Sequence, residues 1–195
     1  YKRLYPVRTG ALVRMTGLLY DSDRVTLLEQ GDVAYDRGDD ARLRRIVWGL
    51  FQNSRSGEKY IVSSTHLDLI RSGEEKAERA VMESQADQAA ALAKSLMAQY
   101  KCSVFACGDF NAMDGGGYDP VYDAPEIYSR LSKKMQDTKA LAAKTKSGNN
   151  KKASAPTYDH IFLTGTAKVR CYGILSDGAM DAMSDHYPIY ADVKI

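Results

Sequence analysis

Ser103-Val-Phe-Ala-Cys-Gly-Asp-Phe-Asn111 is the most informative run in this sequence of 195 residues. Its first five residues are small or apolar without interruption, which is typical of a short strand buried on both faces. Gly108 ends the strand and places Asp109 and Asn111 at its carboxyl end. A Gly-Asp-x-Asn string also forms Asx-turns, so its meaning depends on the segments around it.

The three histidines of the chain each lie within two residues of an aspartate. They occur in the segments Ser64-Thr65-His66-Leu67-Asp68, Tyr158-Asp159-His160-Ile161-Phe162 and Ser184-Asp185-His186-Tyr187-Pro188. Carboxylates bind hard divalent cations, and a His–Asp pair can act as a general acid or base near neutral pH. Together with Asp109 and Asn111, these segments predict one site built from strand ends.

The N-terminal part of the chain predicts two β-hairpins. Residues 12–20 and 24–30 flank Asp21-Ser22-Asp23, which has the chemistry of a turn. Residues 43–52 and 59–65 flank a second turn, and the β-branched run of the second arm leads directly into His66.

A long helix and further strands are predicted downstream. Residues 74–99 contain neither Gly nor Pro and predict a helix. Its side facing a sheet is expected to carry Ala77, Val81, Leu92 and Leu96. Strands are expected again at 158–163, 168–175 and 186–194. Hairpins and one long helix over mixed sheets are typical of an α+β sandwich.

Composition narrows the class of protein. The length suits one domain, residues 1–195, and the apolar and charged fractions of 44% and 27% are ordinary for a globular protein. No apolar run approaches the roughly 18 to 20 residues of a membrane span. The chain opens at Tyr1 without a methionine, so any export signal is not visible. Free thiols are expected for the three cysteines, which match no zinc-site spacing: Cys102, Cys107 and Cys171.

The net charge of +2 is unevenly distributed along the chain. Residues 133–152 contain seven lysines and one aspartate. A basic stretch of this kind could contact the phosphate backbone of a nucleic acid. Its content of Ala, Gly, Ser and Asn favours a solvated surface loop instead.

The order and context of these segments resemble the endonuclease/exonuclease/phosphatase superfamily of metal-dependent phosphoester hydrolases. The resemblance extends from the hairpin near Leu18 to the last strand. It implies the DNase I-like fold, a four-layer α/β/β/α sandwich of two mixed β-sheets with the site at one rim. It also implies Mg²⁺ as cofactor, with Mn²⁺ or Ca²⁺ as alternatives.

The resemblance also implies a role for each site residue. His186 is similar to the catalytic histidine, which binds the phosphate or transfers a proton, and Asp159 to the carboxylate that orients it. His66 is similar to a second histidine that holds a non-bridging phosphate oxygen. Asp109 and Asn111 resemble the pair that positions or deprotonates the attacking water. The implied metal ligands are Asp185, Asp109 and Asn111.

Other residues near these motifs have structural alternatives. Asp68 could serve as a helix N-cap or loop acceptor as readily as a site residue. His160 follows Asp159 on a strand, so it should face the opposite side and is expected to be structural. Packing roles are expected for Tyr158, Tyr187 and Trp48, although a base could also stack on Trp48.

One departure from the family pattern concerns the N-terminal part. The family places an asparagine on its first strand and a metal-binding glutamate at the end of its second strand, before the hairpin near Leu18. Residues 1–17 contain neither residue type. The resemblance therefore predicts a fold that is incomplete at the N-terminus, a completing segment, and weak metal binding and activity of these 195 residues alone.

Two functions of different classes fit these observations. The first is a Mg²⁺-dependent phosphoester hydrolase, a phosphodiesterase, nuclease or phosphatase acting on nucleic acid, a phosphorylated small molecule or a lipid head group. The second is a non-catalytic domain that binds phosphate or nucleic acid and is inactive because the N-terminal glutamate is absent. The enzyme is favoured by the complete set of Asp109, Asn111, Asp159, Asp185 and His186.

Overall fold

The computed structural model describes residues 1–4, 16–36, 44–71, 73–115, 119, 121–142, 144–145, 155–176 and 178–195. Its helices are α1 (Glu75–Tyr100), α2 (Pro125–Ser132), α3 (Thr138–Leu141) and a short 3-10 helix (Met180–Ala182). Its strands are β1 (Lys2–Leu4), β2 (Leu18–Tyr20), β3 (Val25–Ala34), β4 (Arg45–Asn53), β5 (Lys59–His66), β6 (Ser103–Asp109), β7 (Gln136–Asp137), β8 (Lys144–Thr145), β9 (Asp159–Thr164), β10 (Lys168–Ile174) and β11 (Ile189–Lys194).

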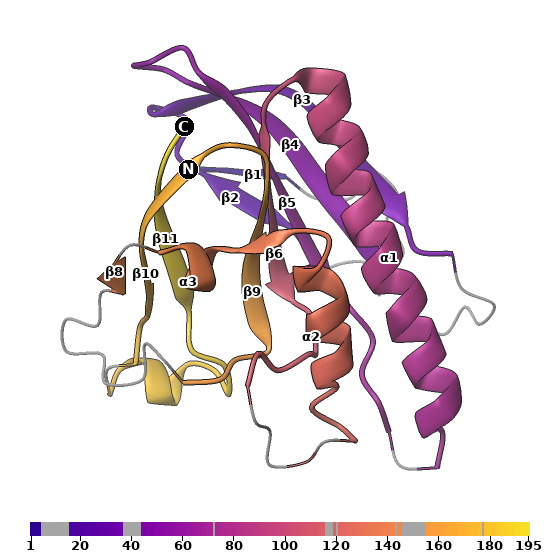
Figure 1. Ribbon diagram of the computed structural model, residues 1–195. Coiled ribbons are helices and arrows are strands. Elements are labelled where there is room, and N and C mark those ends of the chain that lie inside the picture. The colour runs from indigo at the N-terminus through magenta and orange to yellow at the C-terminus, as the bar shows by residue number, and fades with distance from the viewer. Residues whose placement is uncertain are drawn as a thin grey trace.

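The centre of the fold is a six-stranded mixed sheet in the order β3-β4-β5-β6-β9-β7. β5 and β6 are parallel, and the other neighbouring strands are antiparallel. Parallel neighbours need a long crossover connection, which α1 supplies here (Figure 1). The predicted second hairpin is confirmed, because β4 pairs with β5 from Ile46↔Thr65 to Gln52↔Lys59.

The predicted long helix is confirmed within one residue of its expected bounds. Its buried side is the expected one only in part: Leu96 is buried and Leu92 packs against the core, whereas Ala77 is exposed and half of the buried positions are alanines. Trp48 of β4 packs on Tyr100 at the end of α1, with ring centroids 5.8 Å apart, as expected for a core residue. No helix in the described part of the chain is long and apolar enough to cross a membrane. The side of α1 that faces the sheet includes Met82, Ala86, Ala89, Ala90, Ala93 and Leu96.

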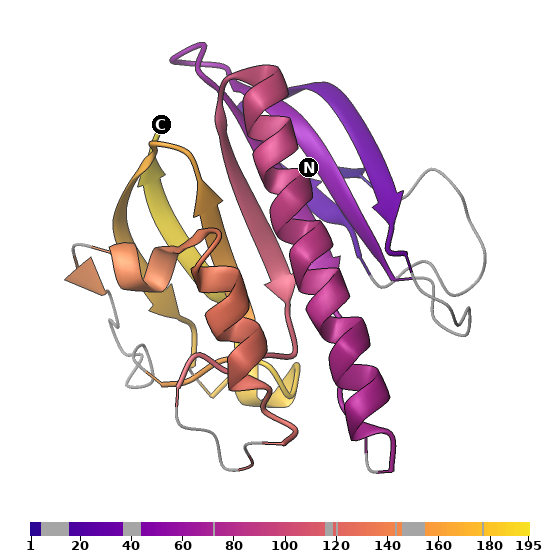
Figure 2. The same ribbon diagram turned by 45° about the vertical axis from the view of Figure 1, so that its right-hand side comes forward.

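Two smaller sheets lie on the other face of the six-stranded sheet. β10 pairs with β11 and β8, and its Val169 packs with Phe105 and Leu163. β1 pairs with β2, whose Tyr20 lies on Phe51 with ring centroids 5.1 Å apart. Side chains alternate between the faces of a strand, so these contacts are on the face opposite to α1. The described elements therefore form a helix layer, a large sheet and a second layer of smaller sheets (Figure 2).

The first predicted hairpin is wrong. The turn itself forms, and the backbone N–H groups of Arg24 and Val25 both donate to the carbonyl oxygen of Asp21. The strands on its two sides join different sheets, because β2 pairs with β1 and β3 pairs with β4. The turn chemistry is local, whereas the packing of Tyr20 on Phe51 places β2 across the face of the sheet.

The lysine-rich stretch (residues 133–152) and the three cysteines are the two features for which composition gave an expectation. The lysine-rich stretch is not simply a solvated loop, because Lys134 and Lys139 form ion pairs with carboxylates. Residues 143 and 146–154, and the side chains of β8, lie outside what the structure describes. The thiols are free and half-buried or buried, as expected, at Cys102, Cys107 and Cys171.

The strands β5, β6 and β9 bring three predicted site residues to one edge of the sheet. His66 is the register partner of Asp109, and Asp109 is in turn the partner of Asp159. Gly108 makes this possible, because a Cβ added to it would lie 1.9 Å from the carbonyl oxygen of Thr65. Its φ of 138° is also one that favours glycine. The close approach of β5 and β6 at this point therefore requires glycine.

Gly108→Ala is expected to reduce the free energy of unfolding by about 3 kcal/mol or more, because the added methyl group collides with backbone rather than with a flexible side chain. Urea unfolding followed by circular dichroism measures the change. Gly178→Ala is the matched control, since no atom lies within 4 Å of its added Cβ, and it should stay within about 0.5 kcal/mol of wild type. Equal stability of the two variants would contradict the close approach.

Candidate functional site

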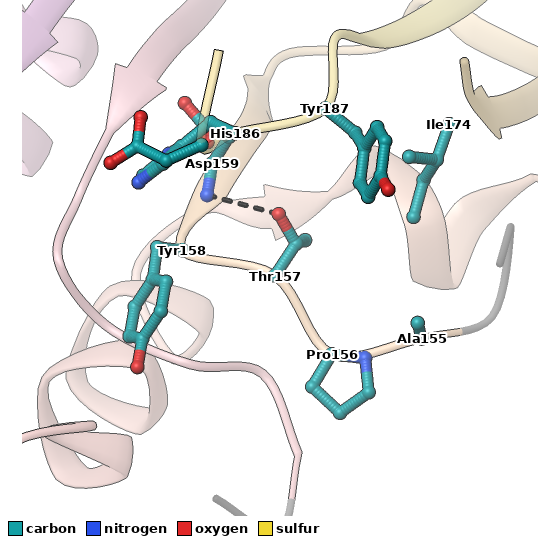
Figure 3. A pocket seen from close by; sticks show the side chains of 9 residues that line it. Ala155, Pro156, Thr157, Tyr158, Asp159, Ile174, His186 and Tyr187 are labelled. Carbon is teal, nitrogen blue, oxygen red and sulfur yellow. Dashed lines mark hydrogen bonds and ion pairs between the residues drawn. The ribbon is translucent and has the colours of Figure 1, made fainter. Parts of the chain in front are cut away.

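His186 and Asp159 form a hydrogen-bonded pair at this edge of the sheet. The distance from His186 Nδ1 to Asp159 Oδ2 is 2.6 Å. Asp159 is the first residue of β9, whereas His186 lies in the loop between the 3-10 helix and β11. Figure 3 shows the two side chains next to each other on one side of a pocket. Such a pair holds an imidazole in one orientation and stabilises its protonated form.

A second His–Asp pair lies beside the first. His66 Nε2 is 3.2 Å from Asp109 Oδ2, and Asp109 Oδ1 accepts a hydrogen bond from the backbone N–H of Asn111 at 2.8 Å. Asn111 adopts a φ of 46°, which asparagine tolerates better than most residues. Its Nδ2 donates to the carbonyl oxygen of Leu67 at 2.8 Å. The oxygen end of the Asn111 amide is therefore the end available as an acceptor or metal ligand.

The two histidines have opposite pKa shifts. Burial disfavours the charged imidazole and lowers the pKa of His66, although the charge of Asp109 opposes this. Burial acts in the same direction on His186, but the hydrogen bond and charge of Asp159 outweigh it and raise the pKa of His186. His186 is therefore the histidine that holds a proton more firmly.

Asp185 precedes His186 in the loop and is exposed to solvent. It lines the same pocket as His186, and its charge adds to the raised pKa of that histidine. The structure thus brings all six predicted site residues to one neighbourhood: four form the two His–Asp pairs, Asn111 is bonded to Asp109, and Asp185 is placed by the loop.

The oxygen atoms of this neighbourhood suit a hard divalent cation. Burial raises the pKa of Asp159, the hydrogen bond from His186 opposes this, and the charge of Asp109 adds to it. Two carboxylates that repel each other are a favourable place for a cation, which would relieve the repulsion. Asn111 and Asp185 supply oxygen donors of the same kind. The donor set therefore fits Mg²⁺ better than a soft metal ion.

The pocket beside the His186–Asp159 pair has a volume of about 440 Å³. Its other walls are residues 155–158, Ile174 and Tyr187 (Figure 3). Tyr158 and Tyr187, which were expected only to pack, both line it. The sequence analysis missed the rest of these walls, because their residues carry no charge or nucleophile. The only hint was the position of residues 155–157 shortly before Asp159, and Ile174 at the end of β10 gave none.

Asp68 and His160 lie apart from the two His–Asp pairs. Asp68 is 2% exposed, forms an ion pair with Arg44, and its backbone N–H donates to Gln85 Oε1 at 2.8 Å. Its carboxylate Oδ2 also accepts from Gln85 Nε2 at 3.4 Å, so Asp68 anchors the loop after β5 to α1, as the loop-acceptor alternative expects. His160 is 1% exposed, and its Nε2 lies 2.7 Å from the carbonyl oxygen of Ala112. It packs on the opposite side of β9 from Asp159.

The sequence matches the model of a known protein family. Residues 11–186 match the model of the endonuclease/exonuclease/phosphatase family. The chain belongs to this family. None of the curated proteins matches the sequence.

Solved structures show that endonuclease/exonuclease/phosphatase proteins share the fold. Mannosyl-6-phosphatase Bt3783 of Bacteroides thetaiotaomicron has a TM-score of 0.68 and 21% identity, covering 90% of this chain and 69% of its own. The human Nocturnin catalytic domain has a TM-score of 0.62 and 19% identity, covering 88% and 60%. A humanized D. rerio TDP2 has a TM-score of 0.61 and 17% identity, covering 89% and 67%.

These similarities confirm the expected DNase I-like α+β sandwich. Identities this low establish the fold alone. The chain spans between 60% and 69% of the length of these three structures.

The opposite pKa shifts of this family member can be measured by NMR titration of the imidazole ring protons in metal-free protein. His186 should titrate above pH 6.5 and His66 below it. Asp159→Asn removes the hydrogen-bonded charge and should lower the His186 midpoint. Asp192→Asn is the control, since its carboxylate pairs with Arg170 in the exposed part of β10 and β11. A His186 midpoint at or below pH 6.5 in wild type would contradict the pair.

Proposed function

We propose that this chain is a metal-dependent phosphoester hydrolase. The main support is the convergence of the pairs His186–Asp159 and His66–Asp109 on one edge of the sheet. Phosphoester hydrolysis needs an aligned water, a proton acceptor, stabilisation of charge on the phosphate oxygens and help for the leaving alkoxide. Membership in the family supports the same class of reaction.

In this proposal, the residues of the two pairs and Asn111 divide three tasks. Asp109 and Asn111 position the attacking water, and Asp109 accepts its proton as the water oxygen bonds to phosphorus. His186, held by Asp159, donates its proton to the leaving oxygen as the P–O bond breaks. His66 binds a non-bridging oxygen, and burial lowers the pKa of its imidazole.

We propose Mg²⁺ as the cofactor, held by Asp109, Asn111 and Asp185, with Mn²⁺ or Ca²⁺ as alternatives that take the same oxygen donors. When bound, it would neutralise charge that develops on the phosphate oxygens. The completing segment expected from the sequence would add a carboxylate to this set. A longer chain that includes such a segment would then bind Mg²⁺ more tightly.

A phosphorylated small molecule is the proposed substrate. The pocket of about 440 Å³ lies in the lower part of the range for small-molecule sites, roughly 300 to 1,000 Å³. One structural neighbour is by name a mannosyl-6-phosphatase, which agrees with a compact phosphorylated substrate. Nucleic acid and lipid head groups remain alternatives with the same phosphoester chemistry.

The competing function is a non-catalytic domain that binds phosphate or nucleic acid through the lysine-rich stretch. Lys134 and Lys139 of this stretch are held by Asp87 and Asp114. Ion pairing within the chain reduces the positive charge that these lysines can offer to a polyanion. This observation favours the enzyme over the binding domain.

His186→Ala is expected to lower kcat by about 10²- to 10⁴-fold, because it removes the proton donor. Hydrolysis of p-nitrophenyl phosphate and bis(p-nitrophenyl) phosphate, with and without Mg²⁺, measures the loss, and plasmid nicking tests for a nuclease. Asp192→Asn should keep wild-type rates. Phosphate binding without turnover by wild type, whatever the metal, would support the non-catalytic alternative.

Asp109→Ala is expected to weaken Mg²⁺ affinity by about tenfold or more, since it removes a charged oxygen ligand. Isothermal titration calorimetry of the 195-residue chain measures the affinity. Asp87→Asn, which changes a carboxylate of α1 bonded to Arg130 of α2 and to Lys134 just after it, should not alter it. Equal Mg²⁺ affinity of wild type and Asp109→Ala would remove Asp109 from the ligand set.

A further inference from the structure

One wall of the pocket lies outside any helix or strand. Residues 155–158 directly precede β9, and all four line the pocket (Figure 3). A segment of this kind has no ladder or helical hydrogen bonds to fix its shape. Its position therefore depends on bonds to other parts of the chain.

Asp114 and Lys139 hold this wall. The backbone N–H of Thr157 donates to Asp114 Oδ1 at 2.8 Å. Lys139 Nζ donates to Asp114 Oδ2 at 2.7 Å and to the carbonyl oxygen of Ala155 at 2.6 Å. One carboxylate and one ammonium group therefore bind the two residues on either side of Pro156.

The Lys139–Asp114 ion pair is largely withdrawn from solvent. The side chains are 16% and 7% exposed. Lys139 is oriented by the start of α3, where its backbone N–H donates to the N-cap residue Asp137 at 2.8 Å. Removing one partner would leave the other charge poorly solvated and without its counter-charge. The pair is therefore a fixed anchor rather than an exposed surface contact.

A metal ion is not needed to explain this cluster. Asp114, Asp137 and His160 have ligand atoms within 4.8 Å of one another, a spacing that could hold a cation. Lys139 already supplies a positive charge in contact with Asp114. The ring of His160 contributes to the same network, with Nδ1 lying 3.6 Å from Asp137 Oδ2 and Nε2 lying 2.7 Å from the carbonyl oxygen of Ala112. The cluster is thus a charge network that supports the pocket wall.

We propose that Asp114, paired with Lys139, is a positioning residue that sets the pocket for a sugar- or nucleoside-sized group esterified to the reacting phosphate. The inference rests on the proposed hydrolase function. It adds that discrimination between substrates depends on a residue remote from the reacting atoms.

One bond links this wall to the chemistry, because the backbone N–H of Asp159 donates to Thr157 Oγ1 at 3.1 Å (Figure 3). The His186–Asp159 pair also has supports outside the wall. Asp159 is held by the ladder between β6 and β9, and the backbone N–H of Phe110 donates to the carbonyl oxygen of Tyr158 at 3.0 Å. His186 is bonded to Asp159. A shift of residues 155–157 therefore changes the fit of the organic group more than the placement of the His186–Asp159 pair.

The test uses two pairs of substrates in which only the organic group changes. The monoesters are mannose 6-phosphate and methyl phosphate, followed by phosphate release. The diesters are thymidine 5′-(p-nitrophenyl phosphate) and methyl p-nitrophenyl phosphate, followed by release of p-nitrophenolate. The measured quantity is the ratio of kcat/KM for the large substrate to that for the small one, in the pair that wild type hydrolyses.

Asp114→Ala is expected to lower this ratio by about tenfold or more, through KM for the large substrate, while kcat for the small substrate stays within about twofold. Lys139→Met should have a similar effect. Asp114→Asn should lower the ratio less, because its Oδ1 can still accept from Thr157. The conservative variant Lys139→Arg should keep a ratio close to that of wild type. The matched control Asp87→Ala also breaks a Lys–Asp ion pair, away from the pocket, and should leave the ratio unchanged.

The possible results separate the two proposals. Failure of wild type to hydrolyse either pair would overturn the hydrolase function and this inference with it. Turnover by wild type with an unchanged ratio in Asp114→Ala would overturn the inference alone. If Asp114→Ala does not fold, as judged by thermal unfolding, Asp114→Asn and Lys139→Met decide by the same ratio. Equal loss on large and small substrates would show a general structural role and would also overturn it.

Discussion

The close approach of β5 and β6 at Gly108 is the contact on which the site depends. Parallel pairing at this point places His66 beside Asp109, and the antiparallel addition of β9 places Asp159 on the other side. Backbone hydrogen bonds therefore set the spacing of groups whose charges would otherwise drive the two carboxylates apart. Changing this spacing would require disrupting the sheet, so the site residues are held rigidly for binding and proton transfer.

Two histidines on one edge acquire different properties from their surroundings. His66 lies at the end of a strand, where burial dominates and favours the neutral ring. His186 meets the carboxylate of Asp159, whose hydrogen bond and charge overcome burial. Opposite environments for like side chains are a common way to divide acid and hydrogen-bonding tasks within one site. The Lys139–Asp114 pair extends this division, because it shapes the pocket without entering the chemistry.

Local patterns predicted those parts of the molecule that local forces determine. The apolar run into Gly108 and the long helix were found because burial and helix propensity act over a few turns. The pairing of β2 was not predicted, because it depends on the contact between Tyr20 and Phe51 across the face of the sheet. The six residues that the structure brings to one neighbourhood were predicted from their chemical types and a family resemblance, and their roles stay predictions. Neither the pocket wall at Pro156 nor the Lys139–Asp114 pair could be predicted in this way, because only the fold brings Asp114 to Lys139.

The two halves of the His186–Asp159 pair are held by different means. Asp159 belongs to a ladder in the centre of the molecule, whereas His186 is on an exposed loop and is tied to the site mainly by one side-chain bond. Segments with few buried contacts open at lower free energy than core strands. Heating should therefore release the imidazole before the sheet melts, so that separation of His186 from Asp159 and loss of the sheet are separate thermal events in this molecule.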